Sequence, residues 1–298
     1  MNNLKSLVYV VIPNRNGTFH LSYSLQFLTN STYENYKIVL VDNGSSDDSL
    51  MYVRNNFKNI NILINKGKKG FAGGVNTGIK YALEQGADYV AVFSNDIKVL
   101  PNWISLALPI FKSFHEVGLV GFNEIAKENE ELFYNSNITA IKTVGKEVKA
   151  VAGCLYICSA ELFGEIGYLD EDYYMYGEDN DWFYRIAKSS FKMIETDIPV
   201  WHYGEGSAGK NKFMPTWYSY RNALRFSLKN ESLFGVVRML LSLMNQGCNI
   251  FLKADHPSFK RLRRYNVVIN FGLIIGSIFW NLFHIIPTMK SRYSLRGA

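Results

Sequence analysis

Cysteine is scarce in this sequence, and its few copies are poorly spaced for a cross-link or a metal site. The 298 residues include only Cys154, Cys158 and Cys248, and the first two form a C-x3-C pair with no histidine nearby. An odd number of cysteines without metal-ligand spacing argues against a disulfide framework and against structural zinc. We therefore expect reduced cysteines in a reducing compartment.

The N-terminal stretch lacks the features of an export signal. Only residues 7–12, LVYVVI, form an apolar run before Pro13, and no small-residue cleavage site follows. This pattern predicts a first β-strand and a protein that stays in the cytoplasm. The sequence also lacks a G-x-G-x-x-G turn after this strand, which argues against a dinucleotide-binding oxidoreductase.

The charges are divided unevenly along the chain. Residues 210–298 carry 14 Lys/Arg against two acids, a net charge of +12, whereas residues 1–209 carry 18 against 24, a net charge of −6. A basic, apolar C-terminal segment suits an anionic membrane surface, and the acidic part suits a metal ion or a polyol. Nucleic acid is a weaker partner for the basic segment, because its charges alternate with apolar runs and not with stacking residues.

Two domains are predicted from the change of pattern along the chain. Apolar strand-like runs alternate with helical patterns up to about residue 210, which indicates a mostly parallel sheet with helices on both faces. From Trp217 onward the pattern is helical. We therefore place an α/β domain at 1–210 and a basic, apolar helical region at 211–298. The predicted strands are 7–12, 38–41, 60–64, 89–93, 118–122 and 151–159, followed by a strand and a glycine-rich loop within 191–210. Residues 123–149 are predicted to form a loop or a short ribbon.

The C-terminal region contains one long uncharged stretch. No Lys, Arg, Asp or Glu occurs between Arg264 and Lys290, a run of 25 residues, which is long enough for a bilayer span of about 20 residues. Asn270, Asn281 and His284 within it favour a peripheral helix or helical hairpin lying in the membrane plane over a spanning helix.

Polar groups follow the predicted strands at two points. Asp42 ends the second strand, and Ser94, Asn95 and Asp96 follow the fourth. Since ligands bind at the carboxyl ends of parallel strands, these residues are candidates for a site. Asp42 could equally be a turn former. Two further stretches complete the set, the glycine-rich GFAGGVNTG at 70–78 and the acidic GEDNDW at 177–182.

The order of these motifs resembles that of the family 2 inverting glycosyltransferases of the GT-A fold. The motifs are, in sequence order, VDNGSSD, GFAGGVNTG, a strand ending at Asp96, GEDNDW and WHYG. Within this family, the chain looks like the bacterial rhamnosyltransferase-like branch, over roughly residues 6–225. YSYRNALRF at 218–226 resembles a Tyr-Arg-Asn helix of that branch.

The resemblance implies a nucleotide-sugar site that uses Mg²⁺ or Mn²⁺. Asp42 would accept a hydrogen bond from the imide of uracil or thymine, and Asp96 and His202 would bind the metal ion. Val75 stands where the family usually has Asn, and Ser94 occupies the place of the first acid in an Asp-x-Asp motif. The implied donor-binding residues are Pro13, Asn14, Asp42, Asn43, Gly74, Asn76, Asn95 and Asp96.

The acidic stretch is implied to carry the catalytic groups. Asp179 would be the general base that takes the proton of the acceptor hydroxyl. Glu178, the first acid of the implied Glu-Asp pair, and Asp181 would position loops or pair with Arg185. Asp181, Trp182 and Arg185 would contact the acceptor or hold loops.

These expectations define a membrane-associated inverting glycosyltransferase that moves a sugar from a dTDP or UDP donor to a glycan or polyprenyl-linked acceptor in bacterial surface polysaccharide synthesis. Rhamnose from dTDP-rhamnose is the first choice of sugar, and UDP-galactofuranose or another UDP-hexose is the second. A membrane-docked subunit that binds nucleotide sugars without catalysis is the non-enzymatic alternative.

Overall fold

A computed structural model provides the structure of this chain. It describes residues 5–67, 69–113, 115–135, 145–204, 213–248 and 265–294. The predicted domain boundary at 210/211 lies outside these ranges, as does the basic run at 260–264.

Contacts between residues divide the chain into two compact units. The first comprises Met1–Tyr174 and Asp179–Ser207, and the second comprises Met175–Glu178 and Ala208–Ala298. The short segment Met175–Glu178 thus belongs with the C-terminal helices, although its neighbours on both sides belong to the first unit.

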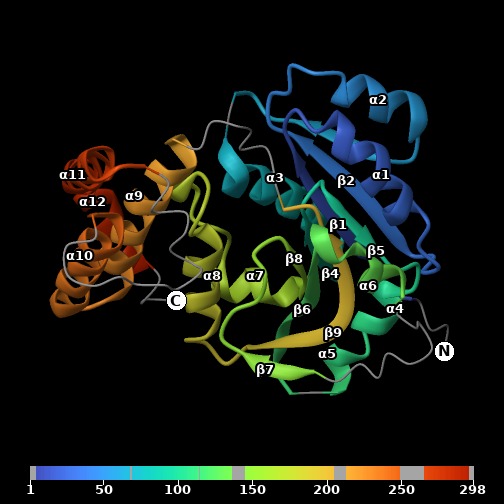
Figure 1. Cartoon of the computed structure of the whole chain (residues 1–298). Helices are drawn as coiled ribbons and strands as arrows, with labels where there is room; N and C mark the ends of the chain where they lie inside the picture. The colour runs from blue at the N-terminus through green and yellow to red at the C-terminus, as the bar shows by residue number, and fades with distance from the viewer. Residues whose placement is uncertain are drawn as a thin grey trace. The chain divides into compact units, whose positions relative to one another are not determined.

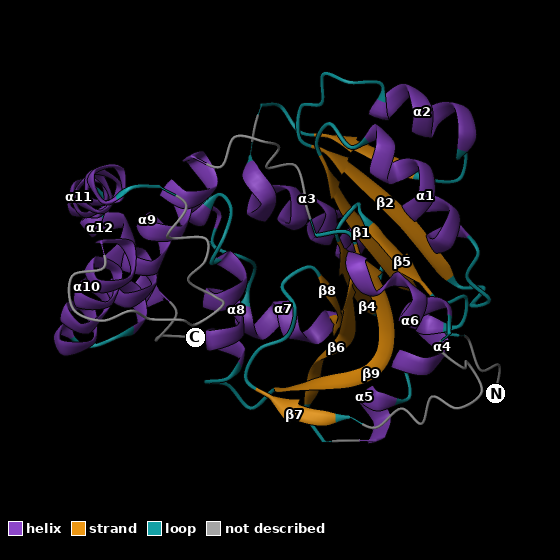
Figure 2. Cartoon of the chain, viewed as in Figure 1, coloured by secondary structure: helices purple, strands orange, loops and turns teal. Residues whose placement is uncertain are grey.

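The first unit is built on one mixed sheet of nine strands (Figures 1 and 2). Strands β1 to β4 are mutually parallel, whereas β8 runs antiparallel between β4 and β6. The spatial order is β3-β2-β1-β4-β8-β6-β9-β5, and β7 pairs with β9. The strands are β1 (Val8–Asn14), β2 (Tyr36–Asp42), β3 (Asn61–Ile64), β4 (Tyr89–Phe93), β5 (Ile97–Val99), β6 (Val117–Ala126), β7 (Lys146–Val148), β8 (Leu155–Ser159) and β9 (Lys192–His202).

Helices cover both faces of this sheet because its central strands are apolar on both sides. Val8, Val10 and Ile12 of β1 pack in one core with α1, and Tyr9 and Val11 pack in a second core with α3. The helices are α1 (Thr18–Thr29), α2 (Ser49–Asn56), α3 (Gly70–Glu84), α4 (Trp103–Ala107), α5 (Ile110–Ser113), α6 (Glu130–Tyr134), α7 (Ala160–Ile166) and α8 (Glu178–Ile186), with 3-10 turns at Lys127–Asn129 and Glu171–Tyr173.

The prediction of a mostly parallel sheet with helices on both faces is confirmed, with two differences in detail. The strand predicted at 118–122 extends as β6 to Ala126, where it pairs with β9 through His202. The run predicted as a strand at 151–159 begins pairing only at Leu155, because residues 151–154 turn into the antiparallel β8. The region predicted as a loop or ribbon therefore contains the end of β6, a 3-10 turn, α6 and β7.

The second unit consists of helices around a small apolar core. The core residues are Tyr220, Leu224, Leu243, Leu273 and Ile274. No single described helix is apolar over a length that could cross a bilayer; Val267–Phe283 and Ile285–Arg292 meet that test only together, with a bend of 67° between them. The helices are α9 (Phe213–Asn230), α10 (Leu233–Cys248), α11 (Val267–Phe283) and α12 (Ile285–Ser294).

Candidate functional site

The carboxyl ends of three adjacent parallel strands bring several polar side chains to one edge of the sheet. Asn14 of β1 lies opposite Asp42 of β2 in the register. Asn95, which follows β4, donates from Nδ2 to Oδ1 of Asn14 at 2.7 Å, and both are buried. A Cβ atom on Gly17 would lie only 2.2 Å from Asn95 Nδ2, so this glycine leaves room for the pair. The sequence reasoning missed Gly17.

Asp42 shapes the turn after β2. Its side chain is 1% exposed, and its Oδ2 accepts hydrogen bonds from the backbone N–H groups of Gly44 and Ser45, each at 3.1 Å. The Ser45 hydroxyl donates to Oδ1. The turn-former reading of Asp42 is thus confirmed. An ionised carboxylate offers about four acceptor positions, so its predicted contact with a nucleobase stays a prediction.

Asn43 and Gly74 belong to a packed junction between the β2 turn and α3. Asn43 donates from Nδ2 to the carbonyl of Gly70 at 2.9 Å and accepts from Asn65 Nδ2 at 2.7 Å. A Cβ atom on Gly74 would lie 2.3 Å from Asn43 Nδ2 and 3.3 Å from Pro13 Cβ. The close approach of α3 to this turn therefore requires glycine at position 74.

Asn76 connects α3 to the segment before α8. Its Nδ2 donates to the carbonyl of Leu169 at 2.8 Å and to Glu171 Oε1 at 3.0 Å, and its Oδ1 accepts from the Leu169 N–H at 3.1 Å. The side chain is 2% exposed. These bonds give Asn76 a structural task, and its predicted contact with the donor stays a prediction.

Asp96 and His202 lie together, as the predicted metal site requires. His202 Nε2 is 3.2 Å from Asp96 Oδ1, and Nδ1 is 2.6 Å from Glu124 Oε1. Asp96 is fully buried; its Oδ2 accepts from the Gly204 N–H at 3.2 Å, and the Ser94 hydroxyl donates to Oδ1. Glu124 was not singled out by the sequence, because it lies 78 residues from His202 and meets it only through the β6–β9 pairing.

The two carboxylates change the protonation of His202. Burial alone would lower the pKa of His202, but hydrogen bonds to Asp96 and Glu124 and their negative charges raise that pKa to about 9. Burial alone would raise the pKa of Asp96, but the hydrogen bond and charge of His202 and the Ser94 hydroxyl lower that pKa to about 2. At neutral pH the pair is therefore an imidazolium held between carboxylates.

This pair predicts a loss of stability at alkaline pH. The pKa of His202 rises from 6.5 to about 9 on folding, so its stabilisation is complete below pH 6.5 and disappears as the pH passes about 9. We expect the free energy of unfolding to fall by on the order of 1–3 kcal/mol across this window. Urea unfolding at a series of pH values would measure it. In His202→Gln the free energy of unfolding should be nearly constant over this pH range. An equally steep fall in the variant would show that His202 is not the group that titrates.

Asp179 stands in the first turn of α8, beside a glycine of the turn before β8. Its Oδ1 accepts the N–H of Asn180 at 2.8 Å. A Cβ atom on Gly153 would lie 2.0 Å from Asp179 Oδ2, so any side chain there would displace the carboxylate. Gly153 was missed, because nothing in the local sequence VAGC points to residue 179.

The segment before α8 is held in an unusual conformation. Tyr174, Tyr176 and Gly177 have φ angles of 63°, 65° and 96°, a region that favours glycine. Within the second unit, Asn222 donates from Nδ2 to the carbonyls of Met175, at 2.8 Å, and Tyr176. Asn222 thus fixes the chain just before Glu178, which is 4% exposed. The amide lies in the helical stretch that resembles a Tyr-Arg-Asn motif, and that stretch was the only signal for it.

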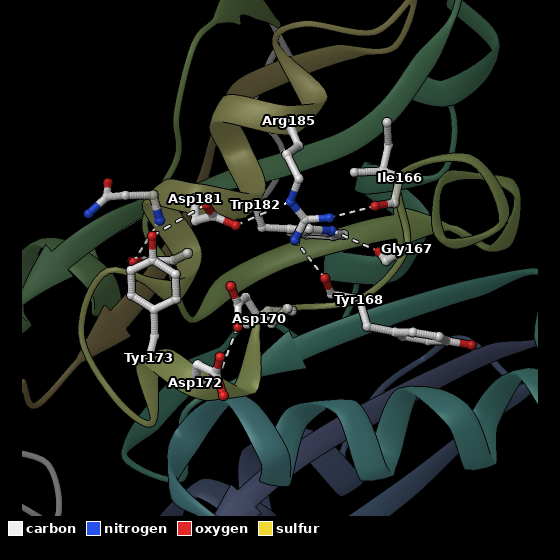
Figure 3. A network of polar contacts seen from close by, with 12 residues as sticks. Ile166, Gly167, Tyr168, Asp170, Asp172, Tyr173, Asp181, Trp182 and Arg185 are labelled. Atoms are coloured by element: carbon white, nitrogen blue, oxygen red, sulfur yellow. Dashed lines mark hydrogen bonds and ion pairs between the residues drawn. The ribbon is translucent and has the colours of Figure 1, made fainter. Parts of the chain in front are cut away.

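Asp181, Trp182 and Arg185 form an internal network (Figure 3). Arg185 Nε is 3.2 Å from Asp181 Oδ2, which confirms their predicted pairing, and Arg185 Nη2 donates to the carbonyl of Tyr168 at 2.6 Å. Trp182 Nε1 donates to the carbonyl of Gly167 at 3.0 Å. Asp181 and Trp182 are fully buried. These three residues were predicted either to contact the acceptor or to hold loops, and their internal hydrogen bonds support the second role.

The described residues contain no group of three or more His, Cys, Asp or Glu that could hold a metal ion. Among the residues that the structure describes, Asp96 and His202 are the pair that could contribute two protein ligands.

Comparisons with known proteins identify a family and a fold. The profile described as Glycosyl transferase family 2 matches residues 9–159. A relative from Escherichia coli, named UDP-Glc:alpha-D-GlcNAc-diphosphoundecaprenol beta-1,3-glucosyltransferase WfgD, is 27% identical over 41% of this chain and 48% of its own length. This chain thus spans about half the length of that curated relative.

Two solved structures share the fold. A crystal structure of GalNAc-T7 with UDP, GalNAc and Mn²⁺ superposes with a TM-score of 0.63, at 16% identity, over 95% of this chain and 58% of that one. The mannosyltransferase PcManGT from Pyrobaculum calidifontis, in complex with GDP-Man and Mn²⁺, gives 0.56 at 14% identity, over 92% and 86%. The first unit therefore has a GT-A-like α/β fold.

Proposed function

Because this chain belongs to glycosyl transferase family 2, we propose that it transfers a sugar from a nucleoside diphosphate to a glycan or lipid-linked acceptor with inversion at the anomeric carbon. Rhamnose from a dTDP donor is the sugar we assign first. The observation that carries this proposal is the edge of the sheet where β1, β2 and β4 end. There Asn95 donates to Asn14, Asn14 lies opposite Asp42, and the buried Asp96 follows Asn95 in the chain.

Asp179 is the general base of this proposal. An alcohol is a weak nucleophile at neutral pH, so a positioned carboxylate must accept its proton as it attacks. The new bond forms between the acceptor oxygen and the anomeric carbon on the face opposite the donor diphosphate. The bond from the anomeric carbon to the diphosphate oxygen breaks, and its electron pair leaves with the nucleoside diphosphate. The small residue Gly153 leaves the space in which the Asp179 carboxylate sits.

The residues present fit a divalent metal ion. Asp96 supplies a hard oxygen and His202 an imidazole nitrogen, and they lie 3.2 Å apart. Glu124 on the other ring nitrogen is the kind of carboxylate that orients a metal-bound histidine. A bound Mg²⁺ or Mn²⁺ would neutralise the charge of the departing diphosphate. His202 must release its Nε2 proton first, so binding of the ion should strengthen as the pH rises.

Asp42 predicts which nucleobase the donor carries. An ionised carboxylate only accepts hydrogen bonds, and uracil and thymine offer N3–H, whereas neutral cytosine presents a bare acceptor. Two facing acceptors in a buried site cost on the order of 1–3 kcal/mol, or roughly ten- to a hundredfold in affinity. UDP and dTDP should therefore bind more tightly than CDP, as competitive titration would measure.

The matched variant for this test is Asp42→Asn. Asparagine keeps one oxygen for the Gly44 and Ser45 N–H groups and adds an N–H donor that cytosine N3 can accept. The preference for UDP and dTDP over CDP should shrink in Asp42→Asn and persist in Asp48→Asn, an exposed carboxylate of the same loop. An unchanged preference in Asp42→Asn would mean that another group reads the base.

A second donor class is supported by the relative from Escherichia coli, whose name gives UDP-Glc as its donor. UDP-galactofuranose or another UDP-hexose is therefore the alternative donor for this chain. A thermal-shift screen of dTDP-rhamnose, UDP-hexoses and GDP-mannose, with and without Mn²⁺, would separate the two, because a ligand that binds only the native state raises its unfolding midpoint. Turnover of the donor that binds would test transfer itself, and binding without turnover would favour a non-catalytic subunit.

A further inference from the structure

Helix α11 of the second unit differs from a surface helix of a water-soluble protein in the residues that it exposes. Helix α11 buries Asn270, Ser277 and Asn281, each at most 2% exposed. Its opposite face presents Val268 and Phe283 at 79% and 84% exposure. A surface helix in water places its apolar stripe inward and its polar residues outward. Helix α11 instead exposes an apolar face over about four turns, and its buried face carries these three polar residues beside Leu273 and Ile274.

The buried polar residues of α11 bind its neighbours within the unit. Asn270 donates from Nδ2 to the carbonyl of Gly247 in α10 at 2.8 Å, and Asn281 donates to the carbonyl of Arg221 in α9 at 2.9 Å. A Cβ atom on Gly276 would lie 2.9 Å from the ring of Trp217, so a small residue allows close helix packing there. Polar side chains and small residues at helix contacts are how helices associate in a lipid environment, where apolar packing alone gives little preference.

Helix α10 also has an exposed apolar face. Leu233, Val237 and Leu241 recur every four residues and are 81%, 46% and 55% exposed, with Phe234 at 76% beside them. Arg238, whose side chain is 70% exposed, follows Phe234 by one turn. A long basic side chain next to an apolar stripe can reach lipid headgroups while its stem covers apolar surface.

We infer that the outward apolar faces of α10 and α11 dock on an anionic lipid surface, with these helices lying in the plane of the interface. The net charge of +12 on residues 210–298 attracts anionic headgroups and would repel the same face of a second copy. Helix α11 has 17 residues, about 26 Å, which is less than the hydrocarbon thickness of about 30 Å. The chain then bends by 67° into the next helix, as an in-plane arrangement allows.

The inference does not depend on the donor or on the chemistry of transfer. Binding of UDP or dTDP by the same preparations, measured in solution without lipid, keeps the two questions separate. A failure of nucleotide binding would count against the proposed function alone.

The test is co-sedimentation of the full chain with phosphatidylcholine vesicles that contain or lack phosphatidylglycerol, at low and high salt. The variant is Val268→Asp with Phe283→Asp, both on the exposed face of α11. Its control is Met51→Asp with Leu132→Asp, at positions of the first unit that are 58% and 60% exposed. Circular dichroism would verify that both variants are folded.

Wild type and control should sediment with anionic vesicles, less so at high salt, and the bound fraction of the α11 variant should fall about tenfold or more. Three results would overturn the inference. One is α11 variant binding equal to that of wild type. Another is attachment that only detergent reverses, which would indicate insertion across the bilayer. The third is a lipid-free dimer of the wild type that the α11 variant converts to monomer, which would mean that a second copy covers this face.

Discussion

Asp179→Asn is expected to lower the turnover number by about a hundredfold or more and to leave the dissociation constant for UDP or dTDP nearly unchanged. The amide has the size of the carboxylate but cannot accept the proton of the acceptor hydroxyl. Loss of a proton acceptor affects the step that forms the new bond and not the binding of the donor. Single-turnover transfer and nucleotide titration on the same preparation would measure the two quantities.

A second variant tests the position of the Asp179 carboxylate and not its ability to accept a proton. In Gly153→Ala the added methyl group would meet Asp179 Oδ2, so the carboxylate must move while its charge remains. Turnover should fall here as well, with nucleotide affinity preserved. The matched control is Gly164→Ala, where a Cβ atom meets nothing within 4 Å and the fall should be absent. Turnover close to that of wild type in Asp179→Asn would remove Asp179 from the mechanism.

Asp96→Asn is expected to abolish the tightening of UDP or dTDP binding by Mn²⁺ and to lower turnover by about a hundredfold. Asparagine keeps the size of Asp96 and one side-chain oxygen, which can accept from either the Gly204 N–H or the Ser94 hydroxyl, but it loses the charge that a divalent cation requires. Isothermal titration of UDP with and without Mn²⁺ would measure the coupling, and electron paramagnetic resonance would count bound Mn²⁺ directly.

His202→Gln should weaken the coupling to Mn²⁺ without abolishing it, because the Asp96 carboxylate remains. Asp197→Asn, which removes an exposed carboxylate from the same strand β9, should behave as wild type. Full turnover of the wild type in EDTA would show that the cluster acts without a metal ion. His202 would then serve only as the cation between Asp96 and Glu124.

The positions of the long strands, though not of the short β5 and β7, could be predicted from the sequence alone, as could the residues at their ends. Runs such as LVYVVI and IVLV are apolar at consecutive positions, and only a strand covered on both faces buries every residue of such a run. Because parallel strands end at a common edge, the residues after them must lie near one another. Asp42 and Asp96 were found in this way, whereas Asn14 came from the family resemblance, and the register of β1 with β2 places Asn14 opposite Asp42.

The direction in which each side chain points was decided only by the tertiary structure. Asn76 faces Leu169, 93 residues away, and His202 faces Glu124, 78 residues away. Such partners depend on strand pairing and helix docking, which involve residues that no local pattern relates. Strand β8 follows the turn that contains Gly153 and pairs antiparallel with β4. This pairing also depends on residues far apart in the sequence.

The C-terminal helices show the same division between sequence and structure. Composition determined that residues 210–298 are basic and apolar, because charge and hydropathy belong to the residues themselves. Only packing decided that Asn270, Ser277 and Asn281 face inward and Val268 and Phe283 outward, because the side of a helix that is buried depends on where its neighbours lie.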